Sequence, residues 1–324
     1  MAKTSYKMIK EIKEQPQVIK NIISEHVKGK KIVFNRLDDA ICDLLKINRF
    51  IFLGCGSSYH AALYGNLVFE EIAKLNCEAE FADEFNKRNP VIEQGTAIVF
   101  LSQSGETKEI LKAIKIAKQR RALIVGITNN KNSTIAKTVD IHIDLAAGKE
   151  VAVPATKTFS SQLLILILLA LFIKQGNKQV LKYINDVKKL PKLIKRVVAN
   201  EKKIKDLVAE LGSKQKLIIL GHKFNYPIAL EGSLKLKEAA GIFAEGIATV
   251  EFEHGPKALS DRVSLARING RSLEINKKKI SVPQISEVLL PILLITPLQF
   301  LAYHLAILKN INPDQPNRIK KFVK

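Results

Sequence analysis

The sequence predicts an α/β protein with two parallel sheets, each covered by helices on both faces. Short apolar runs that end in glycine or in a polar loop alternate with longer segments of helical spacing, as expected for strands buried between helices. The unit of strand, glycine, polar loop and helix also occurs once in each half of the chain. With 324 residues, of which 47% are hydrophobic, the chain is long enough for two domains. It is too apolar to be mainly disordered.

Four strands are predicted in the first half, because each is an apolar run of strand length that ends at a turn or a polar loop. The clearest are RFIFLG at 49–54 and TAIVFL at 96–101. Between the strands, apolar residues recur at helical spacing, except that Pro16 is expected to interrupt the first helix. The predicted strands are 49–54, 96–101, 122–128 and 139–145, and the predicted helices are 5–28, 57–75, 108–119 and 156–174.

The pattern restarts after a lysine-rich helical segment at 175–213. The run KLIILGH at 216–222 resembles RFIFLG and predicts a strand, and 226–240 predicts the helix after it. For the apolar run 288–308 we expect a strand, a turn at Thr296–Pro297 and then a helix, because proline suits the first helical position. The predicted domains are an N-terminal helical segment at 1–48, a first α/β domain at 49–190 and a second, reduced one at 191–324.

The net charge of +21 raises the question of a nucleic-acid partner. The lysines are spread among apolar residues, as on solvated helix faces, and the sequence has no tryptophan that could stack on bases. Nucleic acid is therefore not expected as a partner. A basic protein does attract anionic substrates such as sugar phosphates.

Cysteine usage and apolar runs exclude several other classes. Cys42, Cys55 and Cys77 form no CxxC pair, and no residues have metal-ligand spacing, so we expect no metal and no cofactor. Few cysteines also fit a reducing compartment. The run 163–173 is too short to cross a membrane, and prolines interrupt 288–308. With no apolar signal segment at the N-terminus, we expect a cytoplasmic protein that does not contact a membrane.

The loop 102–107 (SQSGET) is the strongest candidate ligand site in the first half. It follows a predicted strand, and ligands bind beyond the carboxyl ends of strands in open parallel sheets. Ser102, Ser104 and Thr107 offer hydroxyls where a helix begins, and the unpaired N–H groups there suit a phosphate. The alternative is a plain helix cap at Ser104, helped by Thr107. The loop 55–58 shows a weaker version of the same pattern.

The second half contributes titratable side chains. Glu231, Lys235 and Glu238 share one helix face, because they are spaced at i, i+4 and i+7. The alternative is a surface ion pair of little energetic value. His254 lies in a predicted turn and Lys321 near the C-terminus, where an ordinary loop histidine and a solvated tail are the simplest interpretations.

Six segments, taken in order, cover nearly the whole chain. They are FLGCGSSY at 52–59, LSQSGET at 101–107, AGKEVAVPATKTF at 147–159, YPIALEGSLKLKEAAGIFAEG at 226–246, EFEHGPKAL at 251–259 and PLQFLAYHLAILKNINPDQPNRIKK at 297–321. Together they resemble the SIS (sugar isomerase) family, as in the isomerase part of glucosamine-6-phosphate synthase and its stand-alone relatives. The combination of LSQSGET with LEGSLKLKE and EHGP downstream is specific. The resemblance implies two SIS-type, doubly wound parallel-sheet (flavodoxin-like) subdomains, the second of them shortened.

The resemblance also implies a phosphosugar pocket, in which serines and a threonine hold the phosphate. A phosphorylated amino sugar or ketose would be the ligand. By this likeness the pocket falls on Ser58, Ser102, Gln103, Ser104 and Thr107, with the backbone of Val153 and Ala155 beside it.

The same resemblance implies catalytic roles in the second half. The proton-transferring glutamate of the family falls on Glu238, with Glu231 and Lys235 on the preceding helical turns. The ring-opening histidine falls on His254, which would act in the site of a neighbouring subunit and so implies a homodimer. The Schiff-base lysine falls on Lys321, although a lysine also precedes it, at Lys320, where the synthase has a small residue.

Two departures from the family shape the expected function. Ala2 follows Met1 where the synthase has a nucleophilic cysteine, so we expect no glutaminase and a deaminase that converts glucosamine 6-phosphate into fructose 6-phosphate and ammonia. The stretch 262–279 is polar, so the second sheet is expected to be reduced and its phosphosugar loop lost. Three alternatives stay open. They are ammonia-dependent synthesis of glucosamine 6-phosphate, a fructosamine-phosphate deglycase, and a regulator that binds a phosphosugar without turnover.

Overall fold

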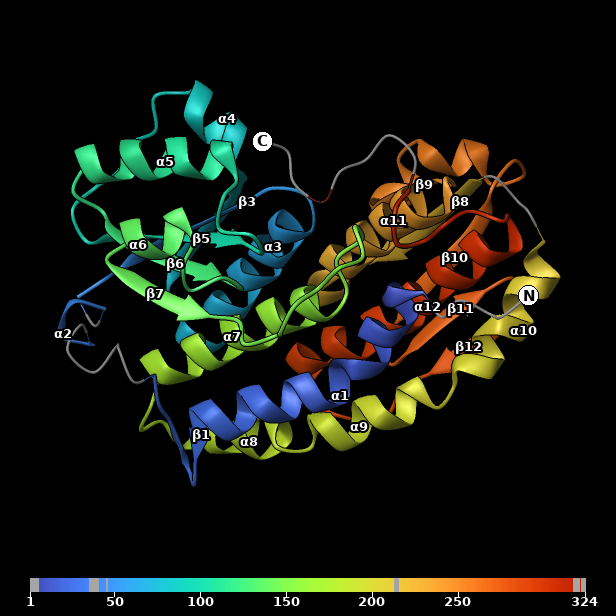
Figure 1. Cartoon of the computed structure of the whole chain (residues 1–324), viewed down its shortest axis with the longest axis horizontal. Helices are drawn as coiled ribbons and strands as arrows, with labels where there is room; N and C mark the ends of the chain where they lie inside the picture. Colours follow the sequence, from blue (N-terminus) through green and yellow to red (C-terminus); the bar gives the residue numbers. More distant parts are fainter. Residues whose placement is uncertain (1–5, 35–40, 45, 213–215, 317–320, 322–324) are drawn as a thin grey trace. The chain divides into compact units, whose positions relative to one another are not determined.

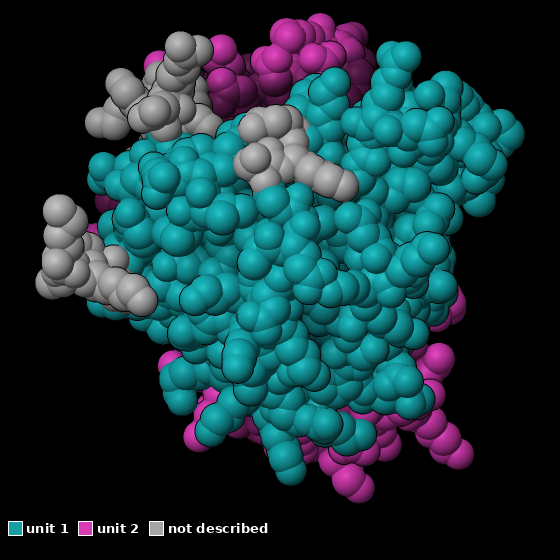
Figure 2. Space-filling view, turned by 90° about the vertical axis from the view of Figure 1, so that its right-hand side faces the viewer, with its two compact units in different colours: residues 1–17, 150–160, 189–321 teal, residues 18–149, 161–188, 322–324 magenta. Residues whose placement is uncertain are grey.

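The computed structural model describes residues 6–34, 41–44, 46–212, 216–316 and 321 (Figure 1). The chain forms two compact units, each assembled from segments far apart in the sequence, and Figure 2 colours them separately. Unit 1 consists of residues 1–17, 150–160 and 189–321, and unit 2 of residues 18–149, 161–188 and 322–324. Each unit contains one five-stranded sheet. The contiguous domain boundaries expected from the sequence stay a prediction.

Unit 2 contains a fully parallel sheet in the strand order β4-β3-β5-β6-β7. In chain order this is 2-1-3-4-5, the doubly wound arrangement in which ligands bind where the strand order reverses. All four strands predicted in the first half are confirmed to within two residues at either end. The strands are β3 (Arg49–Gly54), β4 (Asn76–Phe81), β5 (Thr96–Ser102), β6 (Leu123–Thr128) and β7 (Ile141–Asp144).

Strand β4 was not predicted, because its sequence NCEAEF lacks a continuous apolar run. It is an edge strand, so polar side chains are tolerated there. Its Glu78 receives a hydrogen bond from Arg49 Nε on the neighbouring β3 at 2.9 Å. The remaining elements of unit 2 are β1 (Val27–Lys28), β2 (Lys31–Ile32), α2 (Ile41–Leu44), α3 (Ser57–Val68), the π-helix η1 (Phe69–Ala73), α4 (Ala82–Lys87), α5 (Lys108–Gln119), α6 (Thr134–Thr138) and α8 (Lys178–Val187).

Unit 1 contains the second sheet, in the order β12-β11-β10-β8-β9. Only β8, β9 and β10 run parallel, whereas β11 and β12 form an antiparallel hairpin extension. After β10 the chain turns at Gly270, with φ of +50°, directly into β11. The helix that follows the third strand of the first sheet therefore has no counterpart here. The parallel part of the second sheet is shorter, as predicted, but the sheet keeps five strands, because the hairpin supplies two of them.

The polar stretch 262–279, which the sequence left unassigned, accounts for most of this hairpin region. The strands of unit 1 are β8 (Lys216–Gly221), β9 (Phe243–Ala248), β10 (Ser264–Asn269), β11 (Ser272–Ile275) and β12 (Lys278–Ser281). Its helices are α9 (Leu190–Val198), α10 (Glu201–Leu211), α11 (Tyr226–Ala240) and α12 (Leu290–Leu308), with short 3₁₀ turns η2 (Lys223–Asn225), η3 (Glu251–Glu253), η4 (Pro256–Leu259) and η5 (Glu287–Leu289). Helices α1 (Lys7–His26) and α7 (Lys157–Ile173) each contribute residues to both units.

The predicted interruption at Pro16 is wrong, because α1 continues through it. Proline has no N–H to donate to the carbonyl four residues earlier, which is that of Ile12. The side chain of Gln15 donates to this carbonyl instead, with Nε2 3.1 Å from the oxygen. A neighbouring side chain thus replaces the missing helical hydrogen bond, and the helix is preserved.

The strand and turn predicted within 288–308 are also wrong, because α12 is a single helix with Pro297 inside it. A continuous apolar run does not distinguish a buried strand from a buried helix. An internal proline costs a helix about 3 kcal/mol, which is about the gain from burying one or two large apolar side chains. Since every side chain from Leu290 to Ala302 is buried, the helix forms despite the proline.

The segment Glu287–Leu308 is the one helical stretch of the described residues that is long and apolar enough to cross a membrane. Within the folded chain, however, 94% of its most apolar window is buried. Helices α9, α10 and α11 pack against it in unit 1. Burial in the core of unit 1 therefore explains the apolar composition of this helix.

Candidate active site

The loop 102–107, here called the hydroxyl loop, connects β5 to α5 in unit 2. The Ser102 and Thr107 hydroxyls lie 2.9 Å apart and share a hydrogen bond, and Ser102 Oγ also accepts from Gly105 N at 3.1 Å. Helix α5 begins at Lys108 with Thr107 as its N-cap, and the Thr107 side chain makes no capping hydrogen bond. The plain helix cap at Ser104 is therefore wrong, since Ser104 Oγ bonds only locally, to Glu106 N.

Glycine is required at position 105 of the hydroxyl loop. Gly105 has φ of +69°, and a Cβ atom there would lie 2.1 Å from Ser133 Oγ. The neighbouring strand end holds the loop in place, because Asn129 N donates to the Gln103 carbonyl and Ile135 N to the Gly105 carbonyl, both at 3.1 Å. The loop is therefore ordered before any ligand arrives, and its first-turn N–H groups lack a side-chain cap.

The second predicted loop, at 55–58, leads from β3 into α3. Ser58 is buried, and its Oγ accepts a hydrogen bond from Gln162 Nε2 at 2.9 Å. A Cβ on Gly54 would lie 2.4 Å from the Ser58 backbone, so glycine permits this tight turn. Since β3 and β5 are paired parallel neighbours, their loops leave the same edge of the sheet. Ser58 and the hydroxyl loop thus occupy the position expected of a ligand site.

The cysteine beside this loop is not set up as a nucleophile. Burial, with a smaller contribution from Glu109, raises the pKa of Cys55 to about 11. Burial likewise raises the pKa of Cys77 to about 12. Because the thiolate is the reactive form, both thiols are inert near neutral pH.

The predicted helix face in the second half is a buried ionic cluster on α11 of unit 1, here called the α11 triad. Lys235 Nζ lies 3.3 Å from Glu231 Oε1 and donates to Glu238 Oε2. The side chains of Glu231 and Lys235 are 0% exposed, and that of Glu238 is 20% exposed. The surface ion-pair alternative is therefore wrong. Only Glu238 of the three combines a charge partner with access to solvent.

Opposing effects act on the central lysine of the triad. Burial favours the neutral amine, but the charges of Glu231 and Glu238 outweigh burial and raise the pKa of Lys235 above its ordinary value. Lys235 therefore stays an ammonium ion, and the α11 triad carries two carboxylates and one cation. A permanently charged lysine can stabilise negative charge but cannot act as an amine nucleophile.

Close packing fixes the position of α11. A Cβ on Gly232 would lie 2.7 Å from Leu298 of α12, and one on Gly246 of β9 would lie 2.6 Å from the Ala229 backbone. Two glycines thus let α12 and β9 approach α11 closely. Tight packing of this kind leaves the triad side chains little freedom to move.

Glu150, which sequence analysis did not single out, is the centre of a second polar cluster in unit 1. Its carboxylate is buried and accepts hydrogen bonds from Thr156 N at 2.9 Å, Thr158 Oγ1 at 2.6 Å and Lys321 Nζ at 3.1 Å. Lys321 Nζ also donates to the Ala152 carbonyl. Lys321 is therefore held by a buried carboxylate. Its competitor Lys320 lies outside the described residues.

The sequence does contain a hint that Glu150 is important. It is the one acidic residue of the segment AGKEVAVPATKTF and directly precedes an apolar stretch that contains hydroxyl side chains. Nothing in this spacing showed that a lysine 171 residues away would bind it. The same segment contains the predicted backbone positions Val153 and Ala155, both partly buried. The Val153 N–H is already used, since it donates to the Asp314 carbonyl at 2.9 Å.

Acid should weaken this cluster in a way that a variant can reveal. Burial alone would raise the pKa of Glu150, but the charge of Lys321 and the hydrogen bonds from Thr158 and Thr156 outweigh it and lower the pKa. A lowered pKa in the folded state contributes stability above the unfolded value of about 4.3, which is lost as pH falls from there. Glu150→Gln should cost about 2 kcal/mol at pH 7. As pH falls below about 4.3, the variant should also lose less stability than the unaltered protein, because it lacks this carboxylate.

Urea unfolding at several pH values, followed by circular dichroism, measures this effect. Glu253→Gln is the matched control, because Glu253 forms an exposed ion pair with Lys257 and should change stability little. If the free energy of unfolding fell with pH as steeply in Glu150→Gln as in the unaltered protein, Glu150 would not be the stabilising carboxylate.

His254 is exposed on the turn after η3. Its ring has no hydrogen-bond or ion-pair partner within the part of the chain that the structure describes. Within the described chain, His254 therefore makes no hydrogen bond or ion pair with the α11 triad. Its role in a neighbouring subunit stays a prediction.

Comparison with known proteins now adds to this geometry. A family model described as "SIS domain" matches residues 43–172. The chain therefore contains an SIS (sugar isomerase) domain over these residues. A glutamine–fructose-6-phosphate aminotransferase (isomerizing) from Chlorobaculum tepidum is 31% identical over 98% of this chain, which spans 58% of that relative's length.

Solved structures share the fold of nearly the whole chain. The C-terminal domain of glucosamine-fructose-6-phosphate aminotransferase from Francisella tularensis is 28% identical, with a TM-score of 0.88, covering 97% of this chain and 99% of that one. Glucosamine-6-phosphate deaminase from Thermotoga maritima is 26% identical, with a TM-score of 0.75, covering 98% of this chain and 99% of that one. The likeness is thus to the isomerase domain of the aminotransferases.

The matched SIS domain contains the hydroxyl loop, Ser58 and Glu150. The α11 triad, His254 and Lys321 lie beyond it in the sequence, in unit 1. Hydroxyl groups suited to an anion and titratable groups suited to proton transfer thus come from different parts of the chain.

Proposed function

We propose that this chain is a phosphosugar isomerase/deaminase that converts glucosamine 6-phosphate and water into fructose 6-phosphate and ammonia. The observation that carries the proposal is the α11 triad, in which a partly exposed carboxylate is held by a buried ammonium ion. The hydroxyl loop supports a phosphorylated substrate, and the likeness to a glucosamine-6-phosphate deaminase supports the direction of the reaction.

In this proposal the hydroxyl loop binds the phosphate of the sugar. Ser102 and Thr107 present paired hydroxyls directly before the uncapped first turn of α5. Hydroxyl donors, free N–H groups and the positive end of a helix dipole together favour a dianion. Because the loop is already ordered, little conformational entropy is lost on binding.

The proton transfer falls to Glu238. In the open-chain sugar, its carboxylate takes the proton from C2 and returns it to C1, which converts the amino aldehyde into an imine at C2. Water then adds to the imine carbon, and ammonia leaves as the C2 ketone forms. Lys235 orients the Glu238 carboxylate and stabilises negative charge that develops on the sugar oxygen.

Two further residues complete the proposed mechanism. His254, supplied by a neighbouring subunit of a homodimer, opens the sugar ring, since a histidine can transfer protons near neutral pH. Lys321 offers a second route to the same ketone: its neutral amine adds to the C2 imine in place of water, ammonia leaves as a Schiff base forms at C2, and water then hydrolyses that Schiff base to the ketone and frees the lysine. Glu150 holds the Lys321 side chain in place until substrate arrives.

Phosphate binding by the hydroxyl loop can be tested directly. The double variant Ser102→Ala with Thr107→Val should weaken glucosamine 6-phosphate binding about tenfold or more, because two donors to a charged group are lost. Isothermal titration calorimetry measures the affinity. Thr138→Val removes a hydroxyl that bonds only within α6 and should leave the affinity unchanged. Equal affinities in all three proteins would refute phosphate binding by the loop.

A substrate panel distinguishes the alternatives. Ammonia release from glucosamine 6-phosphate supports the deaminase, and formation of that sugar from fructose 6-phosphate with free ammonia would show the reverse reaction in the same site. Turnover of a fructosamine phosphate alone would indicate a deglycase. Tight phosphosugar binding without turnover, unaffected by Glu238→Gln, would indicate a regulator.

A further inference from the structure

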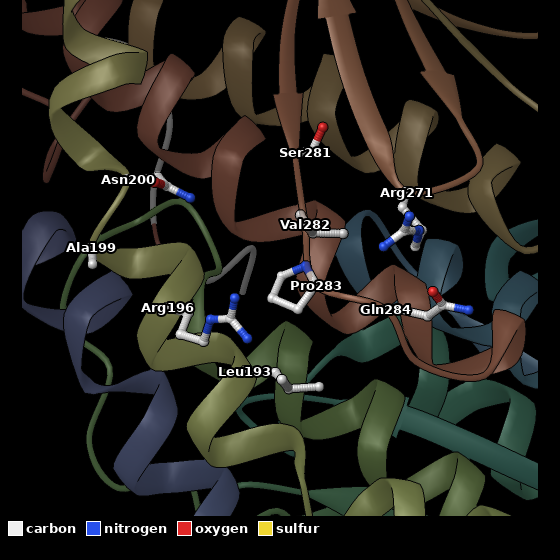
Figure 3. Close-up of a pocket in the computed structure, with 9 residues that line it drawn as sticks. All are labelled: Leu193, Arg196, Ala199, Asn200, Arg271, Ser281, Val282, Pro283 and Gln284. Carbon is white, nitrogen blue, oxygen red and sulfur yellow. The ribbon is translucent and has the colours of Figure 1, made fainter.

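Unit 1 contains a pocket of about 660 Å³ that includes none of the residues discussed above as candidate site residues. Its lining comes from the end of α9, the start of α10, the turn between β10 and β11, and the segment that follows β12. Figure 3 shows that Arg196 and Arg271 reach into it from opposite sides, with Pro283 between them. We call this cavity the arginine pocket.

Both arginines carry charge that the fold does not neutralise. Neither guanidinium has an ion pair or a hydrogen bond in the described part of the chain, and no acidic residue lines the pocket. The acid next to the lining residue Asn200 is Glu201, which is already engaged by Lys13 at 2.6 Å and lies 3.4 Å from His304 Nε2. The pocket thus contains two guanidinium groups without an anionic partner in the described chain, which favours binding of an anion.

The surroundings strengthen this positive field. Residues 188–205, which include all of α9 and the start of α10, contain eight basic residues and a single acid, Glu201. Low-dielectric walls around such a cluster focus the field into the cavity. Part of the unusual net charge of the chain is thereby concentrated around one concave site.

Neutral donors are also available in the arginine pocket. Asn200 is the N-cap of α10, yet its side chain makes no capping hydrogen bond, so the amide is available to a ligand. Gln284 contributes a second amide. Leu193 and Pro283 add apolar wall, which suits the carbon skeleton of a ligand better than a bare ion.

The antiparallel hairpin of the second sheet supplies part of the arginine pocket. Arg271 occupies the turn by which β10 enters the β11–β12 hairpin, and its carbonyl accepts from Val282 N at 2.8 Å just after β12. The hairpin that replaces a helical connection thus carries one of the two arginines. The arginine pocket is thus built partly from a hairpin that has no equivalent in the first, fully parallel sheet.

We propose that the arginine pocket binds a small phosphorylated molecule, whose phosphate is held between Arg196 and Arg271. A phosphate monoester carries about −1.5 to −2 charges at pH 7, which matches two guanidinium groups, whereas a single carboxylate carries one. Guanidinium groups also bind phosphate oxygens in a bidentate manner. The phosphate can belong to a sugar or to a nucleotide.

Calorimetry with inorganic phosphate, on the full chain carrying Ser102→Ala and Thr107→Val, tests the pocket without a contribution from the hydroxyl loop. Arg196→Gln and Arg271→Gln should each weaken binding about tenfold or more, and the double variant should abolish it. Lys195→Gln is the control, because it removes the same charge from the neighbouring position on α9 without lining the pocket. Circular dichroism checks that each variant is folded.

Glucosamine 6-phosphate and adenosine 5′-monophosphate, titrated in parallel, distinguish the sugar from the nucleotide as the source of the phosphate. Tighter binding of either ester than of inorganic phosphate supports the proposal. Binding that survives the double arginine variant, or that falls equally in Lys195→Gln, would overturn it. So would tighter binding of citrate than of any phosphate. Ammonia release from glucosamine 6-phosphate is measured separately, on protein that keeps Ser102 and Thr107. Failure of the arginine-pocket proposal can therefore be told apart from failure of the proposed deaminase function.

Discussion

Glu238→Gln should lower the rate of ammonia release from glucosamine 6-phosphate by about 100- to 10,000-fold, while substrate binding persists. The amide is nearly the same size as the carboxylate but cannot take a proton from C2, and a positioned acid–base group contributes a factor of this order. The 20% exposure of Glu238 beside the fully buried Lys235 makes it the accessible member of the α11 triad. Coupled detection of ammonia and fructose 6-phosphate gives the rate, and calorimetry gives the affinity.

Glu245→Gln is the matched control for this experiment, because Glu245 is an exposed carboxylate on β9 of the same unit. Its variant should retain full activity. A Glu238→Gln protein with normal kcat would show that another group moves the proton, and loss of binding together with activity would point to a structural defect. The pH profile of residual activity separates the two, since only loss of the acid–base group removes its limb of the profile.

Lys235→Met should reduce the free energy of unfolding by about 3–5 kcal/mol, the usual cost of removing one partner of a buried ion pair. Glu231, which is 0% exposed, would then be a buried carboxylate without its cation. A buried carboxylate without a partner destabilises a folded chain more when it is ionised, so the variant should be more strongly destabilised at pH 8 than at pH 5. Urea unfolding followed by circular dichroism measures both effects.

A second substitution tests the cause of this loss. In Glu231→Gln/Lys235→Met the buried pair becomes two neutral side chains of similar size, and much of the lost stability should return. The double variant should nevertheless stay inactive, because Glu238 has lost the cation that orients it. Equal destabilisation of the single and double variants would show that Lys235 acts through packing and not through charge.

Local sequence patterns were sufficient for much of the fold. Buried strands such as β5 are continuous apolar runs, and their periodicity and glycine endings depend only on neighbouring residues. Edge and hairpin strands such as β4, β11 and β12 were missed, because a strand with one exposed side does not need an apolar sequence. The errors at Pro16 and Pro297 have another cause. A proline is a strong local signal, but the Gln15 side chain in one helix and complete burial in the other outweighed it.

By itself the sequence determined four of the five strands of the first sheet, strand β8 of the second, the hydroxyl loop and the shared helix face of Glu231, Lys235 and Glu238, because each is fixed by spacing within a few residues. Only the tertiary structure decided that this face is buried, that Glu150 holds Lys321, and that two arginines 75 residues apart in sequence line one pocket. Burial and charge pairing depend on which distant segments meet. That choice results from packing of the whole chain, which no local pattern records.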